Sequence, residues 1–92
     1  MVWMVERIKT RFVIEETGYD LDVPIQIEIE YRVEGNRVHP SSLSKKLYYN
    51  RPLLIKESRD HTAGELDQMV ERAAERAVKR HFQIREYTVE QD

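Results

Sequence analysis

The feature that most constrains this chain is the alternation of apolar and polar residues along its first third. From Val23 to Val33 every second residue is apolar, and the residues between them are polar or charged apart from Pro24. A period of two places successive side chains on opposite faces of a β-strand. The sequence therefore predicts a strand with one apolar face that must be covered and one face in solvent.

A matching run precedes this strand and turns back into it as a β-hairpin. Alternate residues from Ile8 to Ile14 suit the core, and basic residues stand between them. The dipeptide Gly18-Tyr19 matches the glycine-first preference of a two-residue type II′ turn. The partners that this turn predicts are Ile14–Val23, Phe12–Ile25, Thr10–Ile27 and Ile8–Ile29 on the core face, and Lys9–Glu28 and Arg7–Glu30 on the outer face.

Charge is unevenly distributed along the chain, although the net charge is only −2. Residues 12–34 are strongly acidic, whereas residues 36–61 are basic. The predicted hairpin places acidic residues of its second strand opposite basic residues of its first, and such cross-strand pairs stabilise each other. We therefore interpret the acidic block as a solvated sheet face and not as a binding surface.

Turn signals divide the chain after the hairpin. The residues 34–37 predict a second turn that pairs Val38 with Val33, and His39-Pro40 ends this short strand. Pro24 has no amide hydrogen to donate, so its position in the second strand should lie near a sheet edge or a bulge.

The segment that follows has two interpretations. Residues 41–51 are left open between helix and strand, because Leu43 and Leu47 have helical spacing whereas Tyr48-Tyr49 favours a strand. The apolar run at residues 52–56 then predicts a short buried strand.

One amphipathic helix is predicted near the end of the chain. Thr62 and Glu65 have the spacing of a capping box, and the helix should run from there to about Phe82. A last strand over residues 84–90 should lie parallel to the strand at 52–56, as strand–helix–strand crossovers do. The predicted buried helix face consists of Leu66, Met69, Val70, Ala73, Ala77 and His81, with Ala74 and Val78 on its flank.

Together these elements predict one α+β domain over residues 1–92. The long N-terminal hairpin belongs to a mixed sheet of four or five strands, in the order β-β-β-β-α-β, with the helix packed on one face. A chain of this size buries roughly 60–65% of its unfolded surface, so it can hold a modest core. It contains no cysteine, which excludes disulfides and thiolate sites.

The expected location is the cytoplasm. The apolar start Met1–Val5 meets Glu6 and Arg7 at once, which is too short for the core of a signal peptide. No segment approaches the ~20 apolar residues that cross a bilayer, so no membrane partner is expected. The absence of cysteine agrees with a reducing compartment.

We expect no enzyme, and no cofactor, metal or small-molecule substrate. The serines stand in no G-x-S-x-G or S-x-x-K pattern, and the three histidines lack the spacing of metal ligands. His61 is interpreted as a loop residue. His81 is interpreted as a half-buried residue that bonds a terminal carbonyl of the helix.

One stretch, residues 37–59, has the composition of a nucleic-acid-binding surface. Basic side chains meet phosphates, and aromatic rings stack on the bases of single strands. Surface cations around two core tyrosines would have the same composition, so nucleic-acid binding is the alternative hypothesis. Its candidate contacts are Arg37, Lys45, Lys46, Tyr48, Tyr49 and Arg51.

The length of the hairpin favours another function. Strands of about twelve residues reach about 40 Å, whereas a globule of this size has a radius of gyration of about 12 Å. The hairpin therefore either coils over its own helix or projects from the body, where Met1–Met4 adds apolar surface and a second copy or a partner covers it. We expect a small non-enzymatic accessory protein that binds another protein, or itself, through the hairpin and the sheet edge.

Overall fold

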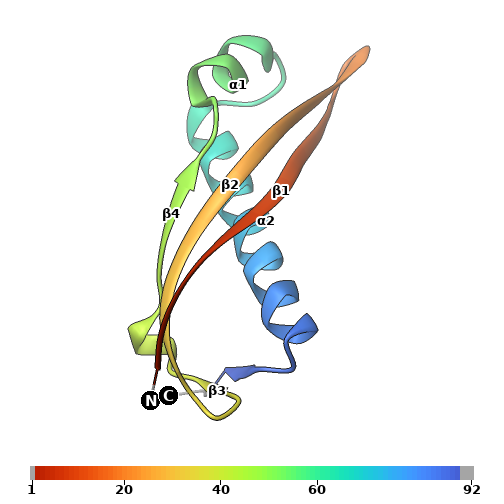
Figure 1. Cartoon of the computed structure of the whole chain (residues 1–92). Helices are drawn as coiled ribbons and strands as arrows, with labels where there is room; N and C mark the ends of the chain where they lie inside the picture. The colour runs from red at the N-terminus through yellow and green to blue at the C-terminus, as the bar shows by residue number, and fades with distance from the viewer. Residues whose placement is uncertain (1, 90–92) are drawn as a thin grey trace.

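A twisted hairpin runs the length of the molecule, and a long helix lies along its inner face (Figure 1). The computed structural model describes residues 2–89 and confirms the α+β fold with a five-stranded mixed sheet. Met1 and Glu90, which belong to the predicted apolar start and last strand, lie outside the described residues. The elements are β1 (Val2–Glu16), β2 (Tyr19–Glu34), β3 (Arg37–Val38), the 3₁₀ helix η1 (Pro40–Ser42), β4 (Ser44–Tyr48), α1 (Arg51–Glu57), α2 (Ala63–Ile84) and β5 (Thr88–Val89).

Strand β2 is the centre of the sheet. It pairs antiparallel with β1 along one side, and with β3 and β4 along the other. Strand β5 pairs parallel with β3 and not with residues 52–56, which are helical. Among the described strands β1 pairs only with β2, so its other edge is open over 15 residues.

The register of the hairpin differs from the prediction by two residues. The turn residues are Thr17 and Gly18, not Gly18 and Tyr19, and Glu16 pairs with Tyr19. The positive φ of +90° therefore falls on the second turn residue, which is glycine. The resulting partners include Ile14–Leu21, Phe12–Val23, Thr10–Ile25, Ile8–Ile27, Lys9–Gln26 and Arg7–Glu28.

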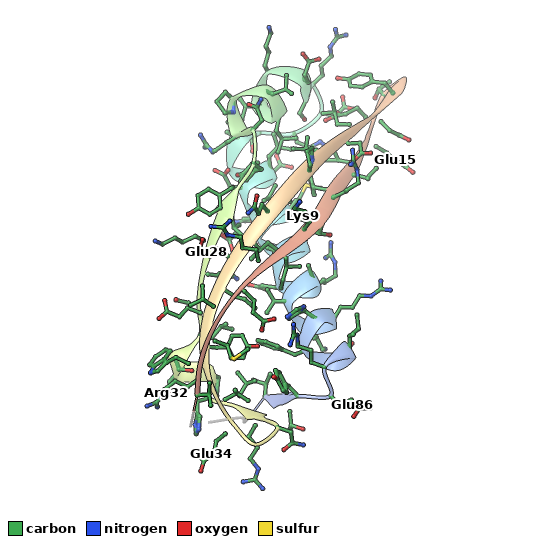
Figure 2. All side chains as sticks on the ribbon, viewed as in Figure 1. Lys9, Glu15, Glu28, Arg32, Glu34 and Glu86 are labelled. Carbon is green, nitrogen blue, oxygen red and sulfur yellow. The ribbon has the colours of Figure 1, made fainter. Side chains whose placement is uncertain are left out.

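A shift of two residues leaves every side chain on the predicted face, because side-chain direction repeats every two residues. The inner face of β2 is buried, and Ile27, Ile29 and Tyr31 are 0% exposed. On the outer face, Arg11 Nε lies 2.7 Å from Asp22 and Arg7 Nε lies 3.7 Å from Glu28. Figure 2 labels Lys9 and Glu28 on the two strands.

The register also fixes which backbone groups of β1 point to the open edge. The residues that flank a β-turn exchange a hydrogen bond, so Glu16 bonds Tyr19 and the even-numbered residues of β1 bond β2. The odd-numbered residues of β1 therefore direct N–H and C=O away from β2. The carbonyl of Arg32 supports this assignment. It points to the side of β2 that faces away from β1 and accepts from the His39 N–H at 3.2 Å.

The predicted strand over residues 52–56 is wrong, because these residues belong to helix α1. Asn50 caps this helix by accepting from the Leu53 N–H at 3.1 Å, and Pro52 occupies its first turn, where no internal donor is needed. Leu54 is 1% exposed, so the apolar run is buried as expected but on a helix. The segment before it, left open by the sequence, contains η1 and β4.

Helix α2 begins with the predicted capping box between Thr62 and Glu65 and continues to Ile84. Its buried face is rotated from the predicted one. Met69, Ala73, Ala77 and His81 are half-buried on the flank of the helix. The residues at its centre are Leu66, Val70, Ala74, Val78 and Phe82. The longer helix leaves only Thr88–Val89 as the described part of the predicted last strand.

The molecule is elongated, with extents of 48 × 22 × 19 Å and a radius of gyration of 15.2 Å. A compact chain of this length would have a radius of gyration of about 12 Å. Helix α2 has 22 residues and spans about 33 Å, so it follows most of the hairpin. The inner face of the hairpin is therefore covered by its own chain, as in the first of the two arrangements considered for it.

Engineered disulfides test the register directly, because the chain has no cysteine. Val5 and Glu30 face each other as a pair without hydrogen bonds, and Cα atoms in such pairs are about 4.5 Å apart. The double variant Val5→Cys/Glu30→Cys should oxidise to an intramolecular disulfide. The pair from the other register, Val5→Cys/Arg32→Cys, should stay reduced under the same conditions. Mass spectrometry after mild oxidation measures both, and preferential closure of the second pair would contradict the register.

Candidate protein-binding groove at the open sheet edge

Two hollows lie between the open edge of β1 and helix α2, and we call them together the β1–α2 groove. The larger has a volume of about 450 Å³ and the smaller about 300 Å³. Arg11, Phe12, Val13, Met69, Arg72, Ala73 and Arg76 line the first. Ile8, Lys9, Thr10, Ala77, Arg80, His81 and Ile84 line the second.

The apolar part of the groove comes from the flank of α2. Met69, Ala73 and Ala77 recur at about one turn of the helix and are half-buried. Helix α2 crosses obliquely behind the hairpin, and its backbone approaches β1 more closely than β2. Its last turns extend beyond the open edge of β1 (Figure 1), and its flank lines the two hollows there. The helix thus carries a wider apolar face than its own sheet covers.

The charged part of the groove is basic. Five of its lining residues are cationic, and no carboxylate lines either hollow. Arg11 is engaged by Asp22. Among the described residues, four cations of the groove take part in none of the ion pairs: Lys9, Arg72, Arg76 and Arg80.

The opposite side of the helix is different in charge. Lys45 of β4 lies 3.4 Å from Glu71 and 3.7 Å from Glu75, so cation and carboxylates meet there. Strand β4 has only five residues, against 15 in β1. The open edge of β1 is therefore longer than that of β4, and the β1–α2 groove beside it is lined by charges of one sign only.

The hairpin tip is fastened to the loop between α1 and α2. The buried carboxylate of Glu16 accepts from the Ser58 hydroxyl and from the Asp60 N–H at 3.0 Å, and His61 Nδ1 lies 3.4 Å away. Asp60 in turn accepts from the Thr17 N–H at 2.7 Å and from its hydroxyl at 3.0 Å. These bonds hold the C-terminal half of β1 in place over the start of α2.

A second fastening holds the other half of β1. Glu6 accepts from the Tyr31 hydroxyl and lies 2.6 Å from Arg85 Nη2 and 3.1 Å from His81 Nε2. Burial raises the pKa of Tyr31, and the bond to Glu6 raises this pKa further. His81 was expected to bond a terminal carbonyl through its side chain, but its ring contacts Glu6 instead. His61, expected in a loop, precedes the helix cap and faces Glu16.

Five of the six candidate nucleic-acid contacts lie from β4 to the start of α1, but three of these five face carboxylates of α2. Lys45 faces the carboxylates of α2, Tyr49 bonds Asp67, and Arg51 forms two bonds of 2.9 Å with Asp67. Lys46 and Tyr48 are exposed on β4. Arg37 lies in β3, at the opposite end of the sheet from α1 (Figure 1). Binding of nucleic acid by this stretch stays a prediction.

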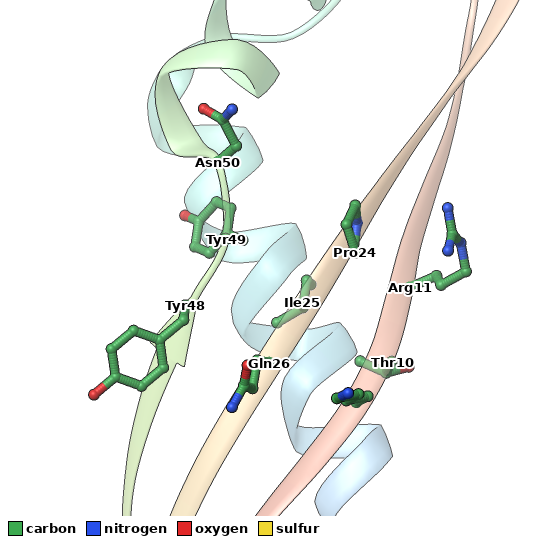
Figure 3. Close-up of a pocket in the computed structure, with 9 residues that line it drawn as sticks. Thr10, Arg11, Pro24, Ile25, Gln26, Tyr48, Tyr49 and Asn50 are labelled. Atoms are coloured by element: carbon green, nitrogen blue, oxygen red, sulfur yellow. The ribbon is translucent and has the colours of Figure 1, made fainter.

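Tyr48 and Tyr49 border a hollow of about 540 Å³ near Pro24 (Figure 3). Even-numbered residues of β2 direct their N–H groups toward β4, and Pro24 has none to offer. The β2–β4 pairing accordingly ends at Gln26–Tyr48, before Pro24 is reached. The predicted edge position of Pro24 is confirmed, and the hollow is the space left where β4 leaves the sheet.

Comparison with known proteins gives no family. No family model, no curated protein and no solved structure matches the chain. None of the helices within residues 2–89 is long and apolar enough to cross a membrane. Within residues 2–89, no three His, Asp or Glu side chains are grouped so as to hold a metal ion.

The fastening at the tip should depend on pH. The hydrogen bond from the Thr17 N–H is the main cause that lowers the pKa of Asp60 below its ordinary 3.8, and bonds to Glu16 and the Thr17 hydroxyl add to it. A carboxylate whose pKa is lowered in the folded state stabilises the fold at pH values above its unfolded-state pKa. This stabilisation is lost as the pH falls through the folded-state pKa. The variant Asp60→Asn should therefore be less stable than wild type at pH 6 and approach it by pH 3.

Urea unfolding at pH 6, 4 and 3 measures this difference. Asp20→Asn, an exposed carboxamide substitution near the same turn, controls for the loss of one charge. A gap between wild type and Asp60→Asn that stays constant down to pH 3 would show that the ionised carboxylate of Asp60 is not what stabilises the tip.

Proposed function

We propose that this protein is a non-enzymatic interaction module that binds another polypeptide by addition of a β-strand to the open edge of β1. The observation that carries the proposal is the juxtaposition of this edge with the apolar flank of α2. An extended segment laid along β1 would pair with its backbone and cover the flank at the same time.

The backbone supplies the first part of the attraction. The odd-numbered residues from Arg7 to Val13 direct N–H and C=O toward the open edge, and recognition by strand addition uses such groups. Each hydrogen bond contributes a net ~0.5–1.5 kcal/mol, and the alternate side chains of the added strand determine specificity.

The side chains next to the edge supply the second part. Val5 and Val13 are 64% and 58% exposed, and Trp3 is 57% exposed beside Arg32, whose guanidinium lies 5.6 Å from the centre of its ring. Natural proteins use bulges, prolines or covering loops to keep long edge strands from pairing with other chains. The described part of β1 contains no proline, and its register with β2 runs without a bulge from Val2 to Glu16.

A proline at an outward N–H tests the mode of binding. Val13→Pro removes an edge donor without breaking a bond to β2, and the extended Phe12 before it suits a following proline. Peptides selected on wild type from a displayed library of random decapeptides should lose at least about tenfold in affinity for Val13→Pro. They should lose less affinity for Val13→Ala than for Val13→Pro, because the alanine variant removes side-chain atoms only and keeps the edge donor.

Circular dichroism of both variants verifies that the fold is retained. Selected peptides that bind wild type and Val13→Pro alike would place the binding site elsewhere. Sedimentation equilibrium at micromolar concentration separates the two kinds of occupant. A dimer that Val13→Pro dissociates would identify a second copy as the strand that is added.

A further inference from the structure

We propose that the β1–α2 groove binds an acidic extended segment of another protein, one in which carboxylate and apolar residues alternate. This inference rests on the proposed function and names the chemistry of its partner. It follows from the charge of the groove, from the direction of its side chains and from the poor match of the edge with a copy of itself.

Four of the five cations of the groove form none of the ion pairs found among the described residues, and the fifth, Arg11, pairs with Asp22. Lys9 on β1 and the row Arg72, Arg76 and Arg80 on α2 border the groove, and no carboxylate lines it. The row repeats every four residues, so its members follow one side of the helix along the groove. A row of cations along a groove attracts a segment of opposite charge and raises its rate of association.

The two faces of an added strand would meet different surroundings. On the inner side its alternate residues would lie over Met69, Ala73 and Ala77, which favours apolar side chains. On the outer side the remaining residues would lie beside Arg7, Lys9 and Arg11, which favours acidic side chains. The acidic outer face of β2 already lies beside these three residues along the paired edge of β1. A strand in which acidic and apolar residues alternate satisfies both.

A second copy of β1 fits the edge poorly. Two copies related by a two-fold axis pair antiparallel, and pairing centred on Lys9 would place the two Lys9 side chains opposite each other. The same pairing places Arg7 opposite Arg11 of the other copy. Like charges directly opposite are destabilising. The basic row therefore disfavours self-pairing through the middle of the edge while it favours an acidic partner.

A nucleic acid is less well suited to the same groove. Phosphates would meet the cations, but a nucleic acid offers no repeating strand backbone to the edge and no alternating apolar side chains to the alanines and methionine of the floor. Competition with a single-stranded RNA distinguishes the two kinds of ligand.

The experiment measures the affinity of two nine-residue peptides for the full chain by fluorescence anisotropy. In one peptide glutamate alternates with valine, and in the other glutamine replaces every glutamate. Each exposed ion pair changes affinity about 1.4- to 5-fold, so the glutamate peptide should bind at least about tenfold more tightly at 50 mM salt. The advantage should shrink at 300 mM salt.

Variants of the protein locate the effect. The triple variant Arg72→Glu/Arg76→Glu/Arg80→Glu should weaken binding of the glutamate peptide at least about tenfold and spare the glutamine peptide. Lys79→Glu is the matched control, because it reverses a charge on the same helix. Lys79 lines a hollow on the β4 side of the helix, not the β1–α2 groove. The control variant should change affinity less than about twofold, and circular dichroism verifies that the helix persists in both variants.

Each result has a defined meaning. Failure of the glutamate peptide to bind at low salt, equal affinity of the two peptides, or indifference to the triple reversal overturns the acidic partner. Peptides that bind equally yet lose affinity for Val13→Pro would keep strand addition and discard only its charge preference. A single-stranded RNA that displaces the glutamate peptide and binds Val13→Pro as well as wild type would make the groove a polyanion site and overturn the proposal.

Discussion

The inner face of β2 packs on one stripe of α2, and the place of every other element follows from that contact. Ile27 and Ile29 of β2 and Ala74 of α2 are 0% exposed, so both layers contribute fully buried residues to one core. The helix crosses the hairpin obliquely, so one flank faces β4 and the other lies beside β1 (Figure 1). On the β4 side the flank carries carboxylates that meet Lys45. On the β1 side it leaves an apolar floor with a basic border.

The faces of the hairpin could be predicted from the sequence, but its register could not. A period of two determines which residues are buried, and either of two neighbouring dipeptides could serve as the turn. Both choices keep Ile25 and Ile27 inside, because they differ by two residues. Charge does not decide between them, since Arg7 meets a carboxylate at Glu28 in one register and at Glu30 in the other.

The helices show the other limit of sequence patterns. The apolar run from Pro52 to Ile55 is too short for its period to separate a strand from a helix. Asn50 and Pro52 are the capping signals that could have identified α1. In α2 the apolar stripe is wider than the buried face, so the sequence placed Met69 at the centre when the structure places it on the flank.

The candidate groove was not predicted because its two walls are far apart in the sequence. The hypothesis on residues 37–59 rested on composition, and composition does not show that Lys45, Tyr49 and Arg51 face carboxylates of α2. Two signals could have indicated the groove. The row Arg72, Arg76 and Arg80 has the spacing of one helix side, and the apolar face of α2 is broader than the stripe that is fully buried.

Amide hydrogen exchange along β1 tests whether this edge is open and ordered. The odd-numbered residues Arg7, Lys9, Arg11 and Val13 should exchange rapidly, because their N–H groups point to solvent. The even-numbered residues from Ile8 to Ile14 should exchange slowly, because theirs bond β2. Uniform protection along β1 in the isolated protein would contradict the account, since it would mean that the edge is already paired.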